Sequence, residues 1–218
     1  LKNSEIQLLK DWIDAGAPYG DSSITVEVPM YNKRSHLGEP DMVLTMRDSF
    51  LIPGENLDKF IMAKIPYEME ADKYVKTIEF IPGNRKFVHH VNGHLVSYIN
   101  GAKINVFEGE HILDYYKKAE DFERFEGLSL ANDDGTYPVL LENVSNYLPS
   151  VVPPIYPKGI GGFTMAKKGA LLLNDLHYGP TPKDEWDQSS FNIFFQDEAP
   201  ERPMKEFYLG TYGVSPVL

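Results

Sequence analysis

The stretch NRKFVHHVNGHLVSY, residues 84–98, combines the composition of a β-strand with three of the six histidines in the chain. Its Val, Phe and Tyr side chains favour an extended strand. Within it lie His89, His90 and His94. Successive side chains of a regular strand point to opposite faces, so the adjacent pair His89 and His90 would send one imidazole into the core. The pair is therefore a candidate for a role other than packing.

Nine further segments have the same strand-like character and are interrupted by Pro and Gly. They are ITVEVPMY (24–31), DMVLTMRDSFLIP (41–53), FIMAKIPYEM (60–69), YVKTIEFIPG (74–83), KINVF (103–107), YPVLLENV (137–144), GGFTMAKKGALLLNDLHYG (161–179), SSFNIFF (189–195) and MKEFYLGTYGV (204–214). Strands of this length and spacing predict an all-β fold, an antiparallel, jelly-roll-like β-sandwich.

A short N-terminal helix is expected before the sandwich, over residues 4–16. Ser4 and Gln7 have the spacing of a capping box, and Gly16 is suited to the C-cap. The apolar residues with helical spacing are Ile6, Leu9, Trp12 and Ile13. They predict one apolar stripe along the helix.

Two segments between the strands are expected to be irregular. Residues 108–136 are charged, so we expect a surface excursion with a helical turn or two near its middle. The sequence NDDG (132–135) predicts a hairpin turn that returns the chain to the strand after it. The Pro-rich segment 148–159 is excluded from the centre of a sheet and predicts a loop.

Composition excludes several classes of function. The 218 residues include 21 Lys and Arg against 32 Asp and Glu, a net charge of −11. This balance argues against nucleic acid or an anionic membrane as partner. The chain has no cysteine, which excludes disulfides, thiolate metal sites and covalent haem attachment within these residues. No apolar run is long enough to span a bilayer.

His89 and His90 are candidate metal ligands, because neutral imidazole is a common ligand for copper and zinc. Both can reach one metal only if the strand is bulged or twisted there, or if the metal lies at a sheet edge and is bound through Nδ1. His177, which ends an apolar strand just before a turn, is a third candidate. Two interpretations stay open: a three-histidine metal site, or structural histidines of which one is buried and one exposed.

The other histidines and the acidic residues do not indicate a catalytic site. His94 is expected beside the site or at the surface, and His36 and His111 are expected to be solvated. The acids of KDEWDQS (183–189) suit either a calcium site or a solvated turn, and the turn is favoured. No serine or cysteine nucleophile signature is present.

The VHHV pair, followed much later by LHYGP, resembles the first copper domain of the copper type II, ascorbate-dependent monooxygenases. Animal members of that family are peptidylglycine alpha-hydroxylating monooxygenase and dopamine beta-monooxygenase. The segment YPKGIGGFTMAKKGALLLNDLHYGPTPKDEWDQSSFNIFF is most similar to bacterial relatives with a fused cytochrome c domain. The resemblance covers residues 38–213 and implies copper bound by His89, His90 and His177, in a periplasmic or extracellular protein.

Residues 1–21 resemble the end of the haem domain in those bacterial relatives. The resemblance therefore implies two domains: 1–21, a remnant of a cytochrome c-like domain with its linker, and 22–218, the copper domain. Haem c would belong to a missing upstream domain. A second copper domain, with a His-x-His pair and a Met, would follow downstream, and the chain alone would be inactive as an enzyme.

One departure from the family concerns the residue two positions before the third ligand. The family has a polar amide there, and this chain has Asp175. The substitution is expected to alter hydrogen bonding or charge at the site.

A non-catalytic β-sandwich module that binds a glycan or a protein through aromatic residues is the alternative function. The substrate is not indicated by the sequence.

Overall fold

The structure is a computed structural model that describes residues 2–21, 23–24, 35–117, 120–205 and 207. The chain divides into two compact units, Leu1–Asn32 and Lys33–Leu218. The boundary falls among residues outside the described set, so the predicted division after residue 21 stays a prediction. The predicted strands at 24–31 and 204–214 also lie largely outside the described residues.

The N-terminal unit contains α1 (Asn3–Asp14). The predicted Ser4–Gln7 capping box is wrong, because the N-cap is Lys2, two residues before Ser4. The backbone N–H of Lys2 instead donates to the Glu5 carboxylate at 2.6 Å. The C-cap is Ala15, one residue before the predicted Gly16; Gly16 follows it with φ +81°, and its N–H donates to the carbonyl of Ile13 at 2.9 Å.

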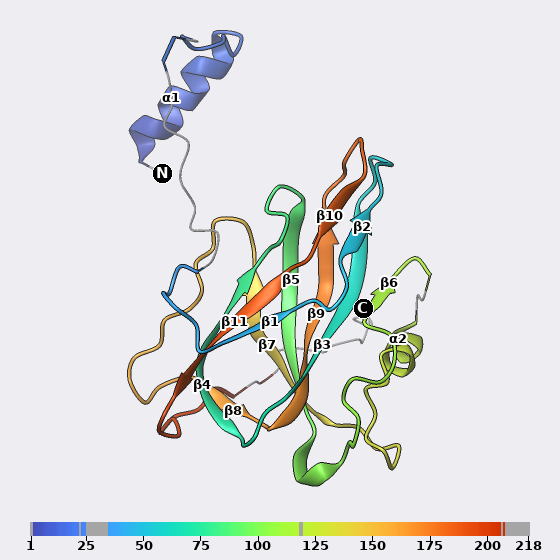
Figure 1. The fold of residues 1–218 in the computed structure, drawn as a ribbon. Helices are drawn as coiled ribbons and strands as arrows, with labels where there is room; N and C mark the ends of the chain where they lie inside the picture. Colours follow the sequence, from blue (N-terminus) through green and yellow to red (C-terminus); the bar gives the residue numbers. More distant parts are fainter. Residues whose placement is uncertain (1, 22, 25–34, 118–119, 206, 208–218) are drawn as a thin grey trace, which may run out of the picture. The chain divides into compact units, whose positions relative to one another are not determined.

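The second unit is an antiparallel β-sandwich, as predicted (Figure 1). The strands of the described residues are β1 (Met42–Thr45), β2 (Phe50–Ile52), β3 (Lys59–Glu68), β4 (Lys73–Ile81), β5 (Val88–Ser97), β6 (Ile112–Asp114), β7 (Val139–Tyr147), β8 (Phe163–Met165), β9 (Lys168–Tyr178), β10 (Glu185–Asp187) and β11 (Ser190–Gln196). One sheet has the order β1-β11-β4-β8, and the larger sheet has the order β6-β3-β9-β5-β7. β10 and β2 form a separate two-stranded ribbon.

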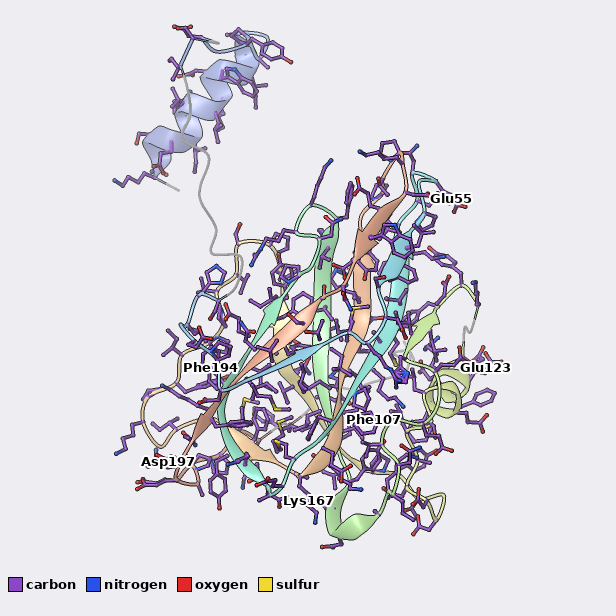
Figure 2. The ribbon with its side chains drawn as sticks, viewed as in Figure 1. Glu55, Phe107, Glu123, Lys167, Phe194 and Asp197 are labelled. Carbon is purple, nitrogen blue, oxygen red and sulfur yellow. The ribbon has the colours of Figure 1, made fainter. Side chains whose placement is uncertain are left out.

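The two faces of the larger sheet are covered differently. Leu171 and Leu173 of β9 belong to the main core, which lies between the two sheets. Side chains fill this space (Figure 2). Ala170 and Leu172 alternate with them and belong to a smaller cluster on the other side. We call that side the outer face of the larger sheet.

Part of the outer face is covered by the segment between β5 and β7. This segment contains the short 3₁₀ helix η1 (Ile99–Gly101), β6 and α2 (Asp121–Gly127). Leu128 and Leu130, which follow α2, are buried against Val96 and Leu172. The predicted helix in this excursion is confirmed, whereas strand β6 was missed because three residues give too short a pattern.

Two local predictions in this region are wrong. The segment 103–107 forms no strand. The NDDG sequence forms a turn, in which the N–H of Gly135 donates to the carbonyl of Asn132 at 2.9 Å. It is no hairpin, however, because the flanking strands β6 and β7 pair with β3 and β5 instead of with each other. Residues 148–159 form no strand, as predicted.

Candidate metal centre

A distortion of β5 places two successive histidines on the outer face. Val88 and Val91 both lie in the core between the sheets, although they are three positions apart. Regular alternation would put them on opposite faces. The register with β9 shifts on both sides of His90, so the strand accommodates an extra residue there. Of the alternatives left open by the sequence, a bulge is present, and it frees both His89 and His90 from the core.

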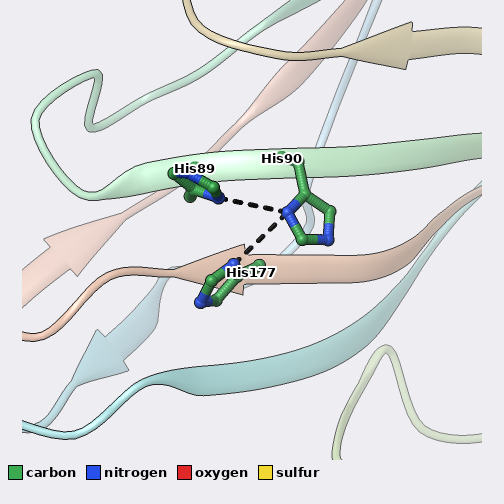
Figure 3. A group of neighbouring side chains, drawn as sticks. All are labelled: His89, His90 and His177. Atoms are coloured by element: carbon green, nitrogen blue, oxygen red, sulfur yellow. Dashed lines mark hydrogen bonds between the residues drawn. The ribbon is translucent and has the colours of Figure 1, made fainter.

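The third histidine is supplied by direct strand pairing. His177 of β9 is the register partner of His90 of β5. Its neighbours Leu176 and Tyr178 lie in the core, so His177 projects from the outer face. The rings of His89, His90 and His177 point toward one another (Figure 3). The structure therefore brings together the three histidines that the resemblance named.

The three rings approach one another through their Nδ1 atoms. The Nδ1 of His90 lies 3.2 Å from the Nδ1 of His89 and 3.3 Å from the Nδ1 of His177. One ligand atom from each residue lies within 4.8 Å of the others. Two nitrogens bound to one metal at about 2.0–2.1 Å with a near-tetrahedral angle are about 3.3 Å apart. The spacing of these nitrogens suits a common metal ion.

Asp58, which precedes β3, contacts the opposite side of the His177 ring. Its Oδ1 lies 2.7 Å from Nε2 of His177. A carboxylate at this distance keeps the proton on Nε2, so that Nδ1 presents a lone pair. This pairing of a carboxylate with a metal-binding imidazole is frequent in metal sites, because it fixes both the tautomer and the ring orientation.

The hydrogen-bonding capacity of the cluster favours a bound cation. With the His177 proton on Nε2, its Nδ1 can only accept. His90 Nδ1 carries at most one proton, so in the neutral state its contacts with His89 and His177 cannot both be ordinary hydrogen bonds. A metal ion would satisfy all three lone pairs at once. The residues present therefore fit a metal bound by three imidazoles.

Electrostatics also favour the neutral imidazole that a metal requires. Burial lowers the pKa of His90, and the nearby His177 and His89 lower it further. The negative charge of Asp175 acts in the opposite direction.

The ring of Phe60 stacks on His177 with centroids 4.2 Å apart and an angle of 8° between the planes. Phe60 is the β3 register partner of His177, so strand pairing sets this stack.

His94 lies on the same strand as His89 and His90 but outside the cluster. Its Nδ1 accepts the backbone N–H of Asn143 in β7 at 3.1 Å. Asn143 has φ +54°, and the β5–β7 register shifts at this point. His94 therefore supports a strand irregularity, while it also lines a pocket on the outer face.

His36 and His111 were expected to be solvated; His36 is exposed, as predicted, whereas His111 is half-buried, and each has a polar partner. The Nδ1 of His36 lies 2.8 Å from Oε1 of the buried Glu79. The Nε2 of His111 lies 3.2 Å from a guanidinium nitrogen of Arg47. Burial lowers the pKa of His111, with further contributions from Lys64 and Arg47. Polar sequence surroundings gave no sign of these long-range partners.

The acids of KDEWDQS serve the fold. Asp187 is buried and accepts hydrogen bonds from the hydroxyls of Tyr178 and Ser189 at 2.9 and 2.8 Å and from the N–H of Asn84 at 2.7 Å. Asp184 accepts the N–H of Gly54 at 2.9 Å. The predicted solvated turn is therefore wrong for Asp187, whose donors were not visible in the sequence.

Sequence reasoning missed Asp58 and Phe60. Both are defined only by the register between β3 and β9, which brings them beside His177. Asp175 is found in a bulge with φ +49°, where its N–H donates to the hydroxyl of Tyr115 at 3.2 Å.

Searches of protein-family models, curated proteins and solved structures found no match to this chain. No helix among the described residues is long and apolar enough to cross a membrane.

Proposed function

We propose that the chain binds one copper ion through His89, His90 and His177 and acts as the electron-storing domain of a copper-dependent monooxygenase. The observation that carries the metal-binding part is the convergence of three Nδ1 atoms, with Asp58 holding the opposite side of the His177 ring. The copper and monooxygenase parts rest on the resemblance of the VHHV and LHYGP segments to that family.

The ligand set is compatible with copper and with zinc, and the choice of copper rests on the resemblance. Imidazole nitrogen binds copper and zinc, and the affinity of a given nitrogen site is higher for Cu²⁺ than for Zn²⁺. Bound copper would supply one-electron chemistry, because it has two accessible oxidation states. The three neutral imidazoles can serve both states without a change of protonation.

The remaining residues of the site hold this geometry. Asp58 retains the proton of His177 on Nε2, and Phe60 restrains the ring through the stack. The bulge in β5 keeps His89 and His90 on one face. A rigid ligand set favours electron transfer because little has to move when the charge of the site changes. The partners implied by the family, a haem domain and a second copper domain, are part of the proposal, as is the periplasmic or extracellular location.

A redox titration tests the proposal. The full chain loaded with one equivalent of copper is expected to undergo reversible one-electron reduction by ascorbate and reoxidation, followed by optical or voltammetric methods. His177→Ala should lose both the bound copper and the redox signal, whereas His94→Ala should retain both. Tight zinc binding combined with no stoichiometric copper binding would contradict the proposal.

A further inference from the structure

A pocket of about 440 Å³ lies on the outer face of the larger sheet; none of the three metal-site histidines lines it, although Asp175, whose charge acts on His90, does. Its floor is formed by β3, β9 and β5, and α2 with the segment after it forms one wall. The apolar lining includes Met62, Val96, Leu172, Phe125, Tyr137 and Leu140. This volume and a mostly apolar lining with a few polar groups are typical of small-molecule sites.

The charged side chains of the pocket are predominantly acidic. Three carboxylates, those of Asp121, Glu142 and Asp175, line it together with one guanidinium, that of Arg124. Arg124 pairs with Asp121, and its guanidinium lies 4.3 Å from the centre of the Tyr115 ring. The pocket therefore attracts cations and repels anions, because the sum of the nearby charges sets the local potential.

Aromatic rings add a second feature that favours a cation. Phe125 and Tyr137 form a tilted pair at one wall, with ring centroids 5.1 Å apart. Aromatic faces attract ammonium groups through their quadrupole, and they also cover an apolar body. A pocket that combines carboxylates with aromatic rings therefore suits an organic cation that also has an apolar part.

Hydrogen bonds made by Tyr115 restrain the polar end of the pocket floor. The Tyr115 hydroxyl donates to Oδ1 of Asn174 at 2.9 Å and accepts the N–H of Asp175 at 3.2 Å. These contacts hold Asp175 in its left-handed backbone conformation, φ +49°. Such a conformation is costly for a residue other than glycine and is frequently associated with functional sites.

We propose that this pocket binds a small organic ammonium ion whose alkyl or aryl body lies against Leu172 and Phe125 and whose charge lies near Glu142 and Asp175. The proposal is independent of the copper assignment. It concerns a separate pocket that requires no metal.

Binding can be tested with three probes that share a six-carbon chain and differ in charge: hexylammonium, hexan-1-ol and hexanoate. Each is titrated into the full metal-free chain at neutral pH and low salt, and the backbone amide shifts of Val96, Leu172 and Asn174 are followed by NMR. Hexylammonium is expected to bind with a Kd on the order of millimolar, given its few heavy atoms. Hexan-1-ol and hexanoate should bind at least about tenfold more weakly, because neither is attracted by the acidic lining.

Substitutions test separately how the charge and the shape of the pocket contribute to hexylammonium binding. Glu142→Gln and Asp175→Asn should each weaken hexylammonium binding about two- to fivefold, the range of a partly exposed charge pair. Asn is suitable at position 175 because it tolerates positive φ. Leu140→Lys places a positive charge at the pocket and should abolish binding. Val139→Lys is the matched control, since Val139 is equally exposed on the same strand but does not line the pocket, and it should bind as the wild type does.

Equal binding of hexan-1-ol would overturn the proposal by showing a purely apolar pocket, and preferential binding of hexanoate would show that Arg124 dominates. Absence of shifts with all three probes would overturn it as well. Copper binding by the Leu140→Lys variant is measured in parallel and should equal that of the wild type. A failure of this inference is thereby distinguishable from a failure of the proposed function.

Discussion

Asp58 Oδ1 lies 2.7 Å from His177 Nε2, although the two residues are 119 positions apart in the sequence. The antiparallel pairing of β3 with β9 creates this contact, because it aligns Lys59 with Tyr178 and Phe60 with His177. The carboxylate determines which nitrogen of His177 remains available for a metal. The contact therefore connects the fold of the sandwich with the chemistry of the site.

Removal of this carboxylate should weaken metal binding without abolishing it. Asp58→Ala frees the His177 ring to rotate and to change tautomer, so we expect a loss of copper affinity of about 10- to 100-fold. Isothermal titration with a competing chelator measures this change. Glu55→Gln is the control, because it removes one negative charge from the same loop, and it should bind copper as the wild type does. Similar losses in both variants would mean that only the overall charge matters.

The aromatic stack should contribute a smaller part of the affinity. Phe60→Ala removes the ring that lies against His177, and an aromatic pair is worth about 0.5–1.5 kcal/mol, or about two- to tenfold in affinity. Phe60→Tyr keeps the stack and should be nearly neutral. If Phe60→Ala binds copper as tightly as Phe60→Tyr does, the stack does not position the ligand.

Copper affinity should fall as the pH is lowered through the histidine range. Protons and the metal compete for the same lone pairs, and unperturbed imidazole titrates at about pH 6.5. The lowered pKa of His90 keeps this ligand neutral to a lower pH than an exposed histidine. We therefore expect constant affinity above about pH 7 and a progressive loss below about pH 6.5. Unchanged affinity down to about pH 5 would be incompatible with a histidine-only site.

Gly93 is expected to be irreplaceable in β5. A Cβ atom at this position would lie 2.3 Å from the carbonyl oxygen of Ser145 and 3.2 Å from the Phe191 ring. The β5 and β7 backbones would have to separate, so Gly93→Ala should lower the free energy of unfolding by about 1–3 kcal/mol or more. Urea denaturation measures this loss. The control is Gly20→Ala, where a Cβ atom meets nothing within 4 Å, and equal stability of the two variants would refute the packing argument.

Runs rich in Val, Ile, Leu, Phe and Tyr, broken by Pro and Gly, were sufficient to predict the sandwich, because strands β3, β4, β5, β9 and β11 are long enough to be recognised by composition. β6 and β10, with three residues each, were not recognisable. The helix start was misplaced because Lys2 contributes only its backbone N–H to the cap, which no side-chain pattern indicates.

The three histidines were identified from the sequence, but their environment was not. The adjacent His89 and His90 indicated that a shared metal would need a bulge, a strong twist or a sheet-edge position, since a regular strand cannot place both on one face. The contacts of Asp58 and Phe60 with His177 depend on strand register, and the pairing of His36 with Glu79 joins a residue that precedes β1 to strand β4. Register arises from the whole sheet, so a local pattern does not predict such partners.

The central claim is that His89, His90 and His177 together bind one copper ion, and electron paramagnetic resonance tests it most directly. The spectrum is recorded for the full chain with one equivalent of Cu²⁺, beside the variants His90→Ala, His177→Ala and His94→Ala. We expect nitrogen hyperfine structure from imidazole ligands in the wild type and in His94→Ala. His90→Ala and His177→Ala should lose both this hyperfine structure and stoichiometric copper binding. A wild-type spectrum of hydrated copper, or an unchanged spectrum in His177→Ala, would contradict the claim.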